Sequence, residues 1–159
     1  MHGKIVYKEG FSVIGIAQNG AHHNKKDEHL INRLWDQMLK KTNSVPHKKH
    51  PHIVTGICIP PNHDEYFYIA GVEALDATSI PKGMSVHTFP SFTYIQYRHI
   101  GSIQQLFLTY EKIWNQWLPQ SGYELVDGPT LEVAHTLLHP DLYSHTSEMD
   151  IYIPIKIGQ

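Results

Sequence analysis

The chain has little cysteine and no long hydrophobic run, and each shortage excludes a class of protein. Cys58 is the single cysteine among 159 residues, which excludes an internal disulfide and is typical of a reducing compartment. No apolar run approaches the roughly 20 residues that a membrane-spanning helix needs. The N-terminus "MHGKIVYKEG" also lacks the apolar stretch of a signal peptide. We therefore expect a cytoplasmic protein that does not contact the membrane.

Charge of either sign is also scarce. Charged residues make up 18% of the chain and the formal net charge is −2, so there is no long-range attraction to nucleic acid or anionic lipid. We expect no direct binding to nucleic acid. The hydrophobic share of 41% is typical of a soluble globular protein, and the length suits one domain or two small halves that share a core.

The motifs of common enzymes and metal sites are missing as well. There is no GxSxG, P-loop or GxGxxG, so the sequence predicts no catalytic residue and no cofactor. Six of the thirteen histidines cluster in "AHHNKKDEH" and "PHKKHPH", but lysine-rich segments without HExxH or cysteine partners favour solvated loops over a metal site. Cys58 lies between Ile57 and Ile59, which favours a small core residue over a nucleophile.

What is present is one pattern that occurs twice. "FSVIGIAQ" is a β-branched strand, "KDEHLINRLWDQMLKKTNSV" has the apolar spacing of an amphipathic helix, and "HIVTGICIPP" and "EYFYIAGVEA" follow as strands joined by a hairpin at "PPNHD". "SFTYIQYRHIG" then begins the second copy. "SIQQLFLTYEKIWNQWLP" follows as a helix that Ser102 caps and Pro119 stops, and "TLEVAHTLL" and "MDIYIPIKI" are two more strands.

This repetition predicts an α+β fold with duplicated strand–helix–strand–strand halves. Phe11 and Phe92, which start equivalent strands, are 81 residues apart, a period too long for a solenoid. We expect one domain over residues 1–159, with a first half at about 1–75, a linker at about 76–87 and a second half at about 88–159. The halves should be related by a pseudo-twofold axis, with antiparallel sheets, helices on one side and a ligand groove between the halves.

The stretch "PTLEVAH" carries a carboxylate, Glu132, within a strand. Alternation predicts that Leu131 and Val133 face the helix, which places Glu132 on the uncovered face with Tyr152 of the last strand. One interpretation is a solvated strand carboxylate. The other is a carboxylate in an aromatic pocket that holds a ligand cation. The helix residues Trp114 and Trp117 have the spacing of plain core.

A further set of residues resembles a known family. "FPSFTYIQYRHIG" is similar to the Pro-x-x-x-Tyr-x-x-aromatic-x-His-x-Gly signature of the GyrI-like effector-binding domain, at Pro90, Tyr94, Tyr97, His99 and Gly101. The resemblance continues through "TYEKIWNQWLPQSGYELVDGPTLEVAH" to "MDIYIPIKI", and "YFYIAGVEA" and "IPKGM" match it in the first half. The chain departs from the family at Phe92, where a small residue is common, and at "VAH" after Glu132.

The resemblance implies a module that binds small molecules between its halves. In family members attached to AraC- or MerR-type regulators, this domain binds effectors that are often lipophilic cationic drugs. It implies that Glu132 recognises the cation and that aromatic side chains form the walls. These are Tyr152, Trp117, Tyr94, Tyr68 and Trp114. The two halves fill the chain and leave no room for a helix-turn-helix region, so we expect a stand-alone module.

Two other functions stay open at this point. Some relatives hydrolyse strained electrophilic rings, which would make Glu132 a general base. Other relatives act on gyrase, which would make the chain a protein-binding module, and a homodimer is also compatible with the sequence. The absence of a contiguous acidic run ranks the protein-partner hypothesis third.

Overall fold

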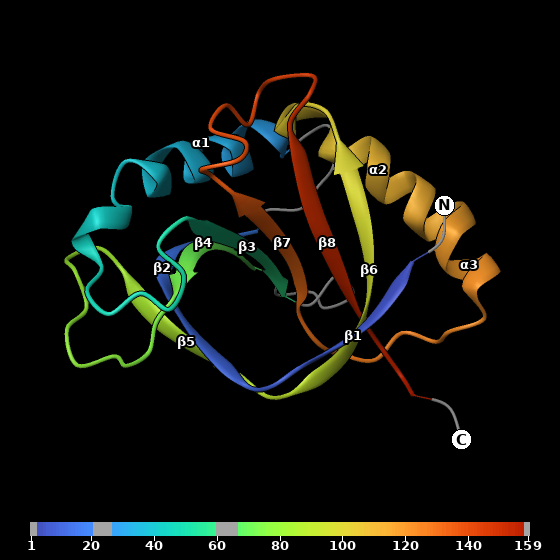
Figure 1. Cartoon of the computed structure of the whole chain (residues 1–159), viewed down its shortest axis with the longest axis horizontal. Helices are drawn as coiled ribbons and strands as arrows, with labels where there is room; N and C mark the ends of the chain where they lie inside the picture. Colours follow the sequence, from blue (N-terminus) through green and yellow to red (C-terminus); the bar gives the residue numbers. More distant parts are fainter. Residues whose placement is uncertain (1–2, 21–26, 60–66, 158–159) are drawn as a thin grey trace.

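The computed structural model describes residues 3–20, 27–59 and 67–157. In these residues eight strands form one antiparallel sheet, and the helices lie on one side of it (Figure 1). This confirms the predicted α+β fold. The part of the chain described contains no helix with the length and apolar character needed to cross a bilayer.

The elements follow each other in the predicted order, with one additional strand before each copy of the pattern. The first copy comprises β1 Lys4–Lys8, β2 Phe11–Asn19, α1 Glu28–Leu39, a 3₁₀ turn Thr42–Ser44, β3 Ile53–Ile59 and β4 Phe67–Glu73. The second comprises β5 Ser85–Phe89, β6 Phe92–Ile100, a 3₁₀ turn Ile103–Gln105, α2 Leu106–Lys112, a π-helical segment Ile113–Trp117, α3 Leu118–Ser121, β7 Thr130–His135 and β8 Glu148–Ile155.

The strand order has the symmetry expected of a duplication. The order is β1-β6-β8-β7-β3-β4-β2-β5, so exchanging each strand with its counterpart in the other copy reverses the list. β3 and β7 pair at the centre, where the two copies meet. The order is therefore consistent with two halves related by a pseudo-twofold axis.

Two of the strands were not predicted from the sequence. β1 lies in the unassigned N-terminal segment, and β5 begins at Ser85, so the end of the expected linker 76–87 is an edge strand. Both strands pair on one side only and alternate weakly in hydrophobicity, which explains why the pattern did not reveal them. The predicted hairpin at "PPNHD" lies outside the described residues.

The second helical region is divided into four segments. Ser102 caps it as expected, with its Oγ accepting a hydrogen bond from the amide of Gln104 at 3.2 Å. The expectation that Pro119 stops the helix was wrong, because Pro119 lies in the first turn of α3, where its missing amide hydrogen costs little. Gly122, with a φ of +78°, ends α3 instead.

The signature histidine holds this region to the sheet. His99 is buried at the end of β6, and its Nε2 donates to the Ser102 carbonyl at 2.9 Å. Its Nδ1 lies 2.6 Å from the Thr109 hydroxyl on α2. His99 therefore joins β6 to the start of the helix that covers the same half of the sheet.

Both faces of the sheet are buried at its centre. On the helix face, buried side chains of α1 and α2 pack against those of the strands, among them Trp35, Tyr110 and Ile151. The opposite face has a second cluster of its own, in which Phe11 and Leu131 are buried and Tyr152 is half-buried. The sheet is curved (Figure 1), and the turn after β1 meets the turn after β5, where the Gly10 amide donates to Ser91 Oγ at 2.8 Å, so the second face of the sheet is partly enclosed.

Candidate functional site

Glu132 is fully buried at the centre of the helix face, on β7. It lies opposite Ile151 of β8, which packs in the same core as the helices. Its carboxylate accepts hydrogen bonds from the Tyr68 hydroxyl on β4 and from the Tyr110 hydroxyl on α2, the second at 2.5 Å. Burying a carboxylate is tolerable only with such partners, because its lost hydration must be replaced.

A glycine makes room for this arrangement. Gly56 of β3 lies directly across from Glu132, and a Cβ at that position would meet the Tyr68 hydroxyl at 1.9 Å and the Trp35 ring at 2.8 Å. Trp35 Nε1 donates to the Tyr68 hydroxyl at 2.7 Å, so a chain of hydrogen bonds runs from α1 through Tyr68 to the carboxylate. The missing side chain therefore lets two aromatic residues lie close to the sheet beside Glu132.

The neighbouring titratable groups stay protonated at neutral pH. Burial first, and the negative charge of Glu132 second, raise the pKa values of Tyr68, Tyr110 and the Cys58 thiol. Both tyrosine hydroxyls are therefore hydrogen-bond donors to the carboxylate, and Cys58 is a buried neutral thiol, as the sequence indicated.

Trp114 and Trp117 both come from the π-helical segment, and their rings have different partners. Trp114 is half-buried and stacks on Tyr110, with ring centroids 6.1 Å apart and planes inclined by 22°. Trp117 packs on Tyr97 of β6 at 5.5 Å. Of these two tryptophans, Trp114 is therefore the one that lies a single aromatic contact away from Glu132.

A cavity of about 340 Å³ opens beside Trp114. Its lining includes Thr130, which shares the helix face of β7 with Glu132, and Asp127. The other lining residues described are Leu125, Val126, Gly128 and Pro154. Phe92, one of the departures from the family pattern, packs against Gly128 of this lining, because a Cβ on Gly128 would meet its ring at 2.8 Å. The cavity therefore adjoins the tyrosine–carboxylate cluster.

The sequence reading placed Glu132 on the wrong face. Tyr152 lies opposite Leu131 and not opposite Glu132, so Tyr152 is on the face away from the helices. Tyr94 is buried on that same face, 6.0 Å from Tyr152 in an edge-to-face contact. The alternation of β7 was misread because both of its faces are buried, so apolar Leu131 does not mark the helix side.

The structure thus brings Tyr68 and Trp114 to Glu132, and it separates Tyr94 and Tyr152 from it. Tyr110, Trp35 and Gly56 complete the cluster and were not singled out from the sequence. For Gly56 a signal existed, because an isolated glycine within a strand often marks a close approach of other groups. Tyr110 and Trp35 gave none beyond the apolar stripes of their helices.

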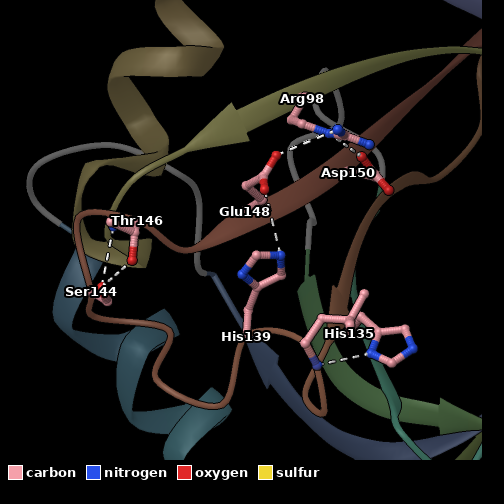
Figure 2. A network of polar contacts seen from close by, with 8 residues as sticks. Arg98, His135, His139, Ser144, Thr146, Glu148 and Asp150 are labelled. Atoms are coloured by element: carbon pink, nitrogen blue, oxygen red, sulfur yellow. Dashed lines mark hydrogen bonds and ion pairs between the residues drawn. The ribbon is translucent and has the colours of Figure 1, made fainter.

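A second polar network lies at the edge of the opposite face (Figure 2). Arg98 of β6 lies 3.2 Å from Asp150 and 3.4 Å from Glu148 on β8, and His139 lies 3.6 Å from the second oxygen of Glu148. Half of the Arg98 side chain is exposed, so solvent screens these pairs and they add little to stability.

Comparison with known proteins agrees with the fold and the sequence pattern. The family model described as Cass2, integron-associated effector binding protein, matches residues 4–155. The transcriptional regulator BrlR of Pseudomonas aeruginosa is 28% identical over 155 residues, which cover 98% of this chain and 56% of the regulator. The chain therefore spans about half the length of this relative.

Solved structures share the fold at low sequence identity. The structure of SAV2435 bound to tetraphenylphosphonium superposes with a TM-score of 0.77 at 16% identity, covering 98% of this chain and 94% of that one. A hydrolase encoded by lin2189 from Listeria innocua superposes with a TM-score of 0.56 at 9% identity, covering 98% and 92%. At these identities the likeness shows the fold alone.

Proposed function

We propose that this chain, which belongs to the Cass2 family of integron-associated effector binding proteins, binds lipophilic aromatic cations beside Glu132. The family supports small-molecule binding, and the buried carboxylate supports the preference for a cation. The tetraphenylphosphonium bound to SAV2435, a protein of the same fold, is a suitable probe for this preference.

One observation carries the proposal: a fully buried carboxylate accepts a hydrogen bond from Tyr110, and Tyr110 stacks on Trp114, which borders a cavity. A cation in that cavity gains attraction to the face of Trp114, of roughly 0.5–2 kcal/mol. It also interacts with the Glu132 charge, by about 2 kcal/mol at a separation of about 8 Å and an effective dielectric constant of about 20. Closer approach requires the Tyr110 ring to move aside.

We propose binding without turnover. A general base must reach a water molecule or the substrate, whereas the Glu132 carboxylate has no exposed surface and accepts two tyrosine hydroxyls. Hydrolysis is the alternative function, because the hydrolase encoded by lin2189 shares this fold. Recovery of every tested ligand unchanged after long incubation, measured by mass spectrometry, supports binding alone, and a product would contradict it.

Titration with tetraphenylphosphonium, followed by tryptophan fluorescence, tests the role of the carboxylate. Glu132→Gln keeps the shape of the side chain and removes its charge, so affinity should fall by about 1–3 kcal/mol, or about 5- to 150-fold. Glu111→Gln is the control, because it removes the same charge from an exposed position on α2 that no proposed site includes. Equal affinities in the two variants would contradict the proposal.

A further inference from the structure

A second hollow lies on the sheet face away from the helices. It has a volume of about 290 Å³, and its floor includes Leu131, Val133 and Tyr152. The other residues described as lining it are Val6, Tyr7, Lys8, Phe11, His50, Ile53, Thr55 and Glu73. Leu131 and Val133 are the neighbours of Glu132 in sequence, so the same strand carries one site on each face.

The chain's own Lys8 ammonium group lies in this hollow as a ligand cation would. Its Nζ lies 3.2 and 3.1 Å from the two carboxylate oxygens of Glu73 and 4.6 Å from the centre of the Phe11 ring. A carboxylate and an aromatic face are the two groups that recognise an organic ammonium ion. The hollow therefore contains a complete cation position.

The two partners of this ion pair differ in their access to solvent. The Glu73 side chain is 9% exposed, while the Lys8 side chain is 27% exposed and extends from the edge strand β1. Because a lysine at a sheet edge can rotate its side chain toward the solvent, the Lys8 ammonium group can leave while the Glu73 carboxylate stays in place. An entering ammonium ion would take over the same contacts.

Tyr94 supplies a second, independent observation. Its side chain is fully buried on this face, and its hydroxyl has no hydrogen-bond partner among the residues that the structure describes. Burial first, and the negative charge of Glu73 second, raise the pKa of Tyr94. A buried hydroxyl without a partner is costly, and the Tyr94 ring packs edge-to-face on Tyr152, which lines the hollow.

There is also room for an apolar body. A neighbouring hollow of about 350 Å³ shares Ile53, Val133 and Tyr152 with the first, so the two are adjacent. Its far side is bordered by the Arg98–Asp150 network (Figure 2). Between the two charged ends the shared surface is apolar and aromatic.

We propose that the hollow at Glu73 is a second binding site, for a primary ammonium ion with an apolar body, and that the Lys8 ammonium group occupies its cation position until a ligand displaces it. The exchange of one ammonium ion for another leaves the charge unchanged, so the affinity comes from the buried apolar body. Lys8 acts as a built-in competitor, and its removal raises the apparent affinity by the reciprocal of the fraction of time that the site is free of it.

Calorimetric titration with hexylammonium tests the site. Lys8→Gln should bind hexylammonium about tenfold more tightly than the wild type, because the competitor is gone. Lys4→Gln is the matched control: it removes the same charge from an exposed position on the same strand and should leave the affinity unchanged. Adding Glu73→Gln to Lys8→Gln should abolish the gain.

Two results would overturn the proposal. One is an affinity for hexylammonium that is the same in Lys8→Gln and Lys4→Gln, with both folded by circular dichroism. The second comes from the wild type, so it does not depend on any variant folding. Amide shifts that change with hexylammonium should lie around Phe11, Leu131 and Val133. Changes confined to the surroundings of Trp114 would contradict a site on this face.

Discussion

At the scale of single residues, the site depends on one carboxylate and the two hydroxyls that hold it. Tyr68 comes from a strand and Tyr110 from a helix, and both donate to Glu132. Because a buried charge without partners costs several kcal/mol, each hydroxyl both stabilises the fold and keeps the carboxylate in position. Changes at these residues should therefore alter stability as well as binding.

Alkaline pH should weaken the fold through these tyrosines. Their pKa values are raised in the folded state, so the unfolded chain releases protons above about pH 10 that the folded chain keeps. Below that pH the raised pKa values contribute fully to the free energy of unfolding. Above it the free energy of unfolding should fall by about 1.4 kcal/mol per pH unit for each tyrosine. Urea unfolding at several alkaline pH values measures this slope, which should be shallower in Tyr110→Phe. Equal slopes would contradict the prediction.

Gly56→Ala should disturb the cluster although it removes none of its polar groups. The added methyl group would lie 1.9 Å from the Tyr68 hydroxyl, so that hydroxyl must move away from Glu132. We expect a loss of about 1–3 kcal/mol in the free energy of unfolding, the usual cost of overpacking. In a Tyr68→Phe background the same substitution should cost less, because one clashing atom is gone. Purely additive costs would show that the two residues do not interact.

At the scale of elements, the sequence predicted which segments are strands and helices better than which way they face. β2, α1, β3, β4, β6, β7 and β8 were all anticipated, because their hydrophobic periods are long and regular. The orientation of β7 was not predicted correctly. Leu131 and Glu132 are both buried, so alternation of polar and apolar residues does not show which face of β7 is toward the helices. Partners that come from other elements, such as Tyr110 and Trp35, carry no local signal at all.

The π-helical segment determines which of its two tryptophans, Trp114 or Trp117, lies at the proposed binding site beside Glu132. It directs Trp114 onto Tyr110 beside the cavity and Trp117 onto Tyr97. Trp114→Ala should therefore weaken tetraphenylphosphonium binding by about two- to thirtyfold, the range of a cation–π contact. Trp117→Ala, the matched control, should lower the melting temperature and leave the affinity within about twofold. A larger binding loss in Trp117→Ala would refute this assignment.

At the scale of the whole molecule, the symmetric strand order is consistent with duplication of one pattern, and the repeat was visible in the sequence. What the repeat does not show is that curvature encloses the second face. Tyr94 and Tyr152 were predicted as walls of the Glu132 site, yet they line or adjoin a separate face with its own ion pair. One small domain thus carries a carboxylate beneath each face of a single sheet, at Glu132 and Glu73.

The central claim is that the Glu132 charge selects cations, and a pair of ligands of the same shape tests it most directly. Tetraphenylphosphonium and tetraphenylborate differ chiefly in the sign of their charge. The wild type should bind the phosphonium at least about a hundredfold more tightly, because attraction of about 2 kcal/mol becomes repulsion of similar size. In Glu132→Gln this ratio should shrink to within about tenfold. A ratio that Glu132→Gln leaves unchanged would contradict the account.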